Sequence, residues 1–167
     1  MATPLSQQTI RTSAQRQIVA FSLGSETYGV DIGSVREIIP SQKIVPVPRA
    51  PEFVEGIINL RGRVIPVLDL RKHFGLLRDA STVEERIILV ESGEDSIGVV
   101  VDAVSSVMQV PVDSIEAPAQ VIVGPDIEYI EGIAKVDRGL IVLVDLTKII
   151  SDAEKKAINE AKKPIVV

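Results

Sequence analysis

Two aspartates stand in closely similar surroundings in this chain and could form a catalytic pair. Asp69 and Asp145 each end a short apolar run and precede a leucine. Two carboxylates that are brought together can act as general acid and general base, with pKa values pushed apart. An aspartate before a short helix can instead cap the free N–H groups of the helix. We expect capping at both positions and keep an acid-dyad hydrolase as the alternative from another class.

Few other side chains could do covalent or metal chemistry. The 167 residues include no cysteine and only one histidine, His73, so thiolate or histidine-cluster zinc sites and disulfides are excluded. A lone histidine is expected to be a surface or half-buried residue rather than a base. The sequence has no phosphate-binding glycine-rich loop. We therefore expect a protein that is not an enzyme and that needs no cofactor or metal.

Arg61 is the side chain best placed for recognition. The segment 59–63, Asn-Leu-Arg-Gly-Arg, links two apolar runs and predicts a hairpin turn with Gly62 at a positive φ. A turn displays its side chains, so Arg61 is either a solvated residue or a fork-shaped donor for a carboxylate or carbonyl of a partner.

Charge and composition narrow the classes of partner. The net charge is −5 and aromatic residues make up 3%, which argues against nucleic acid and anionic membranes. The basic residues Arg61, Arg63, Arg71 and Lys72 are interpreted as a solvated face, which leaves a nucleic-acid binder as a weak third alternative. No apolar run is long enough for a transmembrane helix. The absence of cysteine fits a reducing cytoplasm.

A stretch of the chain occurs twice. Residues 53–74 match 129–150 without a gap, and residues 17–30 match 86–99. This long period with two copies indicates a duplicated domain, with one lobe at about 17–75, a linker at 76–85 and a second lobe at about 86–150. Where the copies agree, we expect structural roles; these positions are Glu55 and Glu131, Gly56 and Gly132, and Asp69 and Asp145.

The two copies differ at places where partners could bind. The pair Arg61-Gly62 corresponds to Asp137-Arg138, and Pro66 corresponds to Val142. Because proline has no N–H to donate, sheet pairing at Pro66 must lack a bond that Val142 can make. We expect one lobe to be specialised at these positions.

The spacing of apolar runs predicts a mainly β protein made of two small five-stranded barrels, with short helices and a C-terminal helix. Helical pieces are expected at 31–39, 70–74, 146–150 and 151–163, after a flexible tail at 1–15. The expected strands are 17–23, 26–30, 43–48, 57–60, 64–69, 86–92, 96–101, 107–111, 120–123, 133–137 and 140–145.

Three motifs resemble the CheW family of bacterial chemotaxis coupling proteins. They are Tyr28-Gly-Val-Asp-Ile32 with Val35-Arg-Glu-Ile38, the run from Phe53 to Leu70, and Gly98-Val-Val-Val-Asp102. The resemblance covers about Gln17 to Ile150. Related domains occur in the histidine kinase CheA and in CheV, but this sequence shows no kinase core or receiver domain, so the stand-alone adaptor matches best.

The resemblance implies two SH3-like barrels around a shared core and a scaffolding function. It implies a cytoplasmic adaptor, monomeric when free, that couples transmembrane chemoreceptors to CheA and is recruited to membrane-associated receptor arrays. An adaptor of the same fold in a non-flagellar chemosensory pathway is the alternative. Arg61 and the groove between the lobes are the implied receptor contacts. The positions that match partner-binding positions of the family are Val35, Glu37, Asn59, Leu60, Arg61, Gly98, Val104 and Val107.

Overall fold

Strands account for most of the chain that the structure describes. The computed structural model describes residues 14–50, 54–73, 84–92, 95–117, 129–137 and 139–149. The expected mainly β fold is confirmed, and short helical turns interrupt it. The elements are β1 Gln15–Leu23, β2 Glu26–Asp31, η1 Ile32–Ser34, β3 Val35–Pro40, β4 Val54–Leu60, β5 Arg63–Asp69, α2 Leu70–His73, β6 Arg86–Ser92, β7 Asp95–Val101, β8 Ala103–Pro111, η2 Val112–Ser114, β9 Ile115–Glu116, β10 Ile130–Val136 and β11 Gly139–Val144; residues 146–149 are helical.

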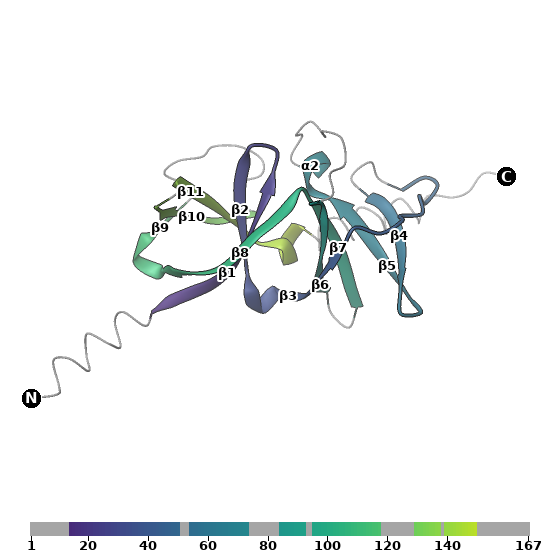
Figure 1. Cartoon of the computed structure of the whole chain (residues 1–167), viewed down its shortest axis with the longest axis horizontal. Helices are drawn as coiled ribbons and strands as arrows, with labels where there is room; N and C mark the ends of the chain where they lie inside the picture. The colour runs from purple at the N-terminus through teal and green to yellow at the C-terminus, as the bar shows by residue number, and fades with distance from the viewer. Residues whose placement is uncertain are drawn as a thin grey trace, which may run out of the picture.

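The strands form two lobes, each built on one sheet (Figure 1). Lobe A has a six-stranded sheet in the order β8-β1-β2-β11-β10-β9, in which β9 is only two residues long. Lobe B has a five-stranded sheet in the order β3-β6-β7-β5-β4. In Figure 1, lobe A lies on the left and lobe B on the right.

The lobes do not coincide with the two halves of the sequence. Strands β1 and β2 come from the first half but pair within lobe A, whose other strands come from the second half. Strands β6 and β7 make the reverse exchange and complete lobe B. Division at 17–75 and 86–150 therefore does not describe the lobes. Matching hydrophobic patterns identify which strands are equivalent, but they do not determine which partner each strand pairs with.

Each lobe nevertheless repeats the same register. Strand β1 pairs with β8 through a bulge at Ala20/Phe21, and β6 pairs with β3 through a bulge at the matching place. Strands β4 and β5 and strands β10 and β11 form matching hairpins. The expected effect of Pro66 is also present: β5 pairs with β7 only from Val67, whereas β11 pairs with β2 from Val142.

The helix expected at 31–39 is wrong. Asp31 accepts a hydrogen bond from Gly33 N at 2.8 Å and caps the short turn η1. From Val35 onward the chain is the strand β3, in which Ile39 is buried and opposite Ile87. The β-branched residues of this segment suit a strand, and their helical spacing was coincidental.

Three other expected elements are reduced or lie outside the described residues. The strand expected at 43–48 is reduced to one bridge between Val45 and Ile57. The strand at 120–123 and the helix at 151–163 lie outside the described residues.

A shared core joins the lobes, as expected. Phe21 and Leu23 of lobe A pack in one buried cluster with Ile88 and Val99 of lobe B. Leu70 and Leu146, from the two helical turns after the repeated aspartates, belong to the same cluster. Burial of aliphatic side chains from both sheets makes each lobe depend on the other for stability.

Candidate partner-binding site

The turn between β4 and β5 holds Arg61 in an unusual backbone conformation. Arg61 and Gly62 have φ values of 52° and 85°, and Gly62 N donates to Asn59 Oδ1 at 3.0 Å. Two-residue hairpin turns of this kind favour Asn, Asp or Gly at the first position, because other residues pay about 1–2 kcal/mol in the left-handed region. The backbone of this turn would be satisfied better by asparagine than by arginine. The presence of Arg61 therefore points to a role for its guanidinium group.

The Arg61 guanidinium forms a two-bond ion pair with Glu37 of β3. Arg61 Nη2 lies 2.6 Å from Glu37 Oε1, and Nη1 lies 3.0 Å from Oε2. The hydrogen bonds from Arg61 lower the pKa of Glu37, and Glu37 in turn raises the pKa of Arg61. The Arg61 side chain is 69% exposed, so donors that Glu37 does not use face solvent.

A second arginine lies beside this pair. Arg36 Nη1 donates to Ser96 Oγ of β7 at 2.6 Å, and Arg36 Nε lies 3.5 Å from Glu91. Ser96 is buried. Sequence reasoning missed this contact, although the replacement of Arg36-Glu37 by Ser105-Ser106 in the second copy was a signal for it.

The eight expected partner-binding positions fall into separate groups. Glu37, Asn59, Leu60 and Arg61 gather around the β4–β5 turn of lobe B. Val107 is 51% exposed on β8 of lobe A. Val35 and Val104 are equivalent positions of the repeat, and both are half-buried against the shared core.

Gly98 differs from this expectation because it is buried inside lobe B. A Cβ at Gly98 would lie 2.8 Å from Ile87 Cγ2. Such a distance is too short for a real Cβ contact, so the glycine permits dense packing beneath the strand. The structure gives Gly98 no surface for a partner, and its effect on binding would be indirect.

The repeated glycines lie where another segment crosses a bulged strand. A Cβ at Gly56 would lie 2.1 Å from Val45 O, and a Cβ at Gly132 would lie 3.0 Å from Glu116 O. Both residues adjoin register shifts in their hairpins. Close backbone approach is a role for which glycine is suited in both lobes.

The repeated glutamates pair with cations from other segments. Glu55 lies 2.6 Å from Lys72 Nζ, and Glu131 lies 2.7 Å from Arg16 Nη2. Arg16 also contacts Asp31 at 3.1 Å, next to the connection from β2 to lobe B. These ion pairs hold the strand ends of each lobe.

Both repeated aspartates accept hydrogen bonds from the helical turn that follows. Asp145 Oδ1 accepts from Lys148 N at 3.1 Å, and Asp69 Oδ1 accepts from Arg71 N at 2.9 Å. Asp69 is fully buried and its carboxylate also contacts the Arg71 guanidinium. A buried carboxylate held by an arginine cannot reach a substrate, which argues against the acid dyad.

Arg71 is buried, so the interpretation of the basic cluster as a solvated face is wrong at this position. Its side chain is 2% exposed and contacts Asp69, Asp102 and Glu85. Burial by itself lowers the pKa of Arg71, but the hydrogen bond and charge of Asp69, with the charges of Asp102 and Glu85, raise it overall. Asp102 also accepts a hydrogen bond from Gly24 N in the β1–β2 turn at 2.6 Å, so the cluster links both lobes.

Comparison with known proteins identifies the family to which this chain belongs. A family model described as a CheW-like domain matches residues 17–154. The chain belongs to the CheW family. Within this family, the chain is similar to the chemotaxis protein CheW of Treponema pallidum (strain Nichols), with 35% identity over 144 residues that cover 84% of this chain and 85% of that protein. It is also similar to the protein FrzA of Myxococcus xanthus, with 27% identity over 148 residues that cover 86% and 91% of the two chains.

A solved CheW structure supports the fold directly. The crystal structure of the scaffolding protein TtCheW from Thermoanaerobacter tengcongensis aligns with a TM-score of 0.72 and 43% sequence identity, over 78% of this chain and 89% of that chain. Among the described residues, no helix has the length and apolar character needed to cross a membrane. The same residues contain no cluster of three or more His, Asp or Glu suited to a metal ion.

Proposed function

We propose that this CheW-family chain is a non-catalytic adaptor that couples transmembrane chemoreceptors to the histidine kinase CheA. Family membership and the likeness to a scaffolding protein support this function. It would act in the cytoplasm, at receptor arrays assembled on the membrane. Neither a cofactor nor catalytic chemistry is needed for such a protein, because its function is to hold two partners together.

The observation that carries the proposal is the Glu37–Arg61 pair on its strained turn. The turn keeps an arginine where asparagine would cost less backbone energy. Glu37 fixes the guanidinium at 2.6 and 3.0 Å, so little side-chain entropy remains to be lost when a partner binds. A fixed arginine with free donors suits carboxylates and carbonyls on a receptor tip.

The test is co-sedimentation of receptor-containing membranes, CheA and this chain. The wild-type chain should sediment with receptor membranes and carry CheA with it. Arg61→Asn should fold with equal or slightly higher stability, because asparagine tolerates the left-handed turn, yet should bind receptor membranes at least tenfold more weakly. Arg63→Asn, also in the hairpin, is the matched control and should bind normally. Normal binding by Arg61→Asn would reject Arg61 as the receptor contact, and absence of wild-type recruitment would reject the adaptor function.

The similarity to FrzA favours one second candidate, an adaptor of the same fold in a non-flagellar chemosensory pathway. Deletion of the gene in its own host distinguishes the two. Loss of swimming chemotaxis supports a flagellar pathway, whereas intact swimming with another chemosensory defect supports the second candidate.

A further inference from the structure

The strand register defines which residues of the two lobes are equivalent at the end that carries Arg61. In lobe B, Glu37 stands opposite Leu89 on β6, after the bulge in β3. In lobe A, Ser106 stands opposite Ala20 on β1, after the matching bulge in β8. Arg61 is the first residue of the two-residue turn after β4, and Asp137 is the first residue of the turn after β10.

The same register relates the second arginine contact to lobe A. Arg36 precedes Glu37, and its counterpart Ser105 precedes Ser106. Ser96, which accepts the hydrogen bond from Arg36, pairs with Glu91 on β6, and its counterpart Thr27 pairs with Ser22 on β1. Lobe A therefore keeps a hydroxyl at the acceptor position but has neither arginine.

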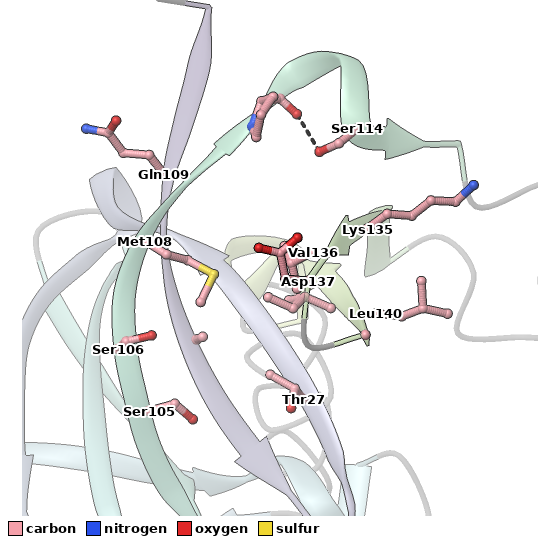
Figure 2. A pocket seen from close by; sticks show the side chains of 14 residues that line it. Thr27, Ser105, Ser106, Met108, Gln109, Ser114, Lys135, Val136, Asp137 and Leu140 are labelled. Atoms are coloured by element: carbon pink, nitrogen blue, oxygen red, sulfur yellow. Dashed lines mark hydrogen bonds between the residues drawn. The ribbon is translucent and has the colours of Figure 1, made fainter.

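In lobe A the four equivalent positions line an open cavity of about 800 Å³ (Figure 2). Thr27, Ser105, Ser106 and Asp137 all border it, and Met108 adds an apolar wall. Figure 2 shows Ser105, Ser106 and Met108 along β8, with Asp137 across the opening. We call this cavity the lobe A slot. At the equivalent positions of lobe B, Arg36 is bonded to Ser96 and Arg61 is bonded to Glu37.

We propose that the lobe A slot binds an arginine side chain that a partner protein presents on a surface turn. Lobe B supplies the template, because there a hydroxyl and a carboxylate hold guanidinium groups at 2.6 to 3.0 Å. In the slot, the Thr27 hydroxyl stands at the position of Ser96. Asp137 adds a carboxylate at the position where lobe B carries Arg61. The aliphatic stem of an arginine would pack on Met108.

Charge and size support this occupant. The described chain gives Asp137 no hydrogen bond or ion pair, and Lys135 of the same rim is engaged with Glu116 at 2.7 Å. A guanidinium carries several donors in a plane, so it can satisfy acceptors on both walls at once, which an ammonium group cannot do as well. A cavity of about 800 Å³ exceeds one side chain, so the backbone turn that carries the arginine would enter with it.

The first experiment measures guanidinium binding without any partner protein. The ¹⁵N-labelled full chain is titrated with N-acetyl-arginine methylamide, and with its citrulline and lysine analogues as controls. The arginine compound should shift the amide signals of Thr27, Ser105, Ser106 and Asp137 in a saturable way. The affinity for the neutral citrulline analogue should be at least fivefold weaker, and Asp137→Asn should remove this preference. Equal affinity for citrulline or lysine, or shifts located elsewhere, would overturn the proposal.

The second experiment closes the slot and rests on the proposed adaptor function. The double variant Ser106→Glu/Asp137→Arg rebuilds in lobe A the ion pair of lobe B. It should bind CheA or the receptor tip at least tenfold more weakly than wild type. Asp113→Asn, which makes the same net charge change of +1 on an exposed residue outside the slot, should bind normally. If the double variant does not fold, Asp137→Asn takes its place, with an expected severalfold loss.

The outcomes separate this inference from the adaptor function. If wild type binds both partners and the closed slot binds them equally well, the slot proposal fails while the adaptor function stands. If wild type binds neither partner, the adaptor function fails, and the arginine titration still tests the slot.

Discussion

At the scale of single residues, Arg61 and Glu37 depend on each other. The turn places the guanidinium at the edge of β3, and Glu37 orients it with two hydrogen bonds. Both side chains are exposed enough for solvent to screen their attraction, so the pair contributes little to stability. Its value lies in fixing the direction of the arginine donors.

This dependence predicts how Glu37 titrates. The hydrogen bonds from Arg61 lower the pKa of Glu37 in the folded protein, so the contribution of the pair is present above the ordinary glutamate pKa and is lost as the pH falls through the folded-state pKa. NMR titration of the Glu37 carboxylate carbon should give a pKa below the ordinary glutamate value. In Arg61→Asn the pKa should rise toward the ordinary value. The same pKa in both proteins would contradict the ion pair in solution.

Residue types predicted the exposed position of Arg61 on a turn, but not the burial of Arg71. The sequence Asn-Leu-Arg-Gly predicts a turn, and the first residue of such a turn is exposed to solvent. Arg71 follows a strand end, and its burial depends on Asp102 from a distant connection. No local pattern indicates that a charged residue will find buried partners from other elements.

At the scale of elements, the bulged hairpins explain why the copies share Glu-Gly. Gly56 adopts a φ of 149°, and Val45 crosses directly over it. The sequence located these hairpins correctly because each is a local unit with a short turn. It failed at β3, since an isolated run of β-branched residues fits both helical and strand periodicity.

Because Val45 approaches Gly56 so closely, a single added methyl group at Gly56 should lower the stability of the fold strongly. Gly56→Ala would place a Cβ at 2.1 Å from Val45 O, and should destabilise the protein by about 3 kcal/mol or more. Gly62→Ala is the matched control, because Gly62 has a positive φ but no atom within 4 Å of a Cβ; it should cost only about 1 kcal/mol. Urea unfolding of both variants measures the difference. Similar losses would show that Val45 can move away without cost.

At the scale of the whole molecule, the exchanged hairpins make the two lobes one folding unit. The chain passes between lobes at η1 and again at Asp102. Arg71 holds the second passage and, through Asp102, the β1–β2 turn at Gly24. The exchange could not be predicted from the sequence, because equivalent strands can pair within either lobe and satisfy the same hydrophobic pattern.

Removal of the Arg71 charge should therefore weaken the whole molecule. Arg71→Met removes the Arg71 charge from the buried Asp69 and Glu85, at a cost of about 3–5 kcal/mol. Arg63→Met, on the exposed start of β5, should change stability by no more than about 0.5 kcal/mol. Urea denaturation measures both, and amide exchange at Gly24 should accelerate only in Arg71→Met. Equal stability of the two variants would contradict the role of Arg71 as a link between lobes.

The adaptor function is tested most directly by kinase activity in a reconstituted assembly. Receptor-containing vesicles and CheA are held at fixed concentrations while this chain is added. The rate of CheA autophosphorylation should rise with the chain and saturate, and Arg61→Asn should require at least tenfold more protein for the same rise. A rate that stays at its starting value across the whole titration with the wild-type chain would contradict the coupling of receptors to the kinase.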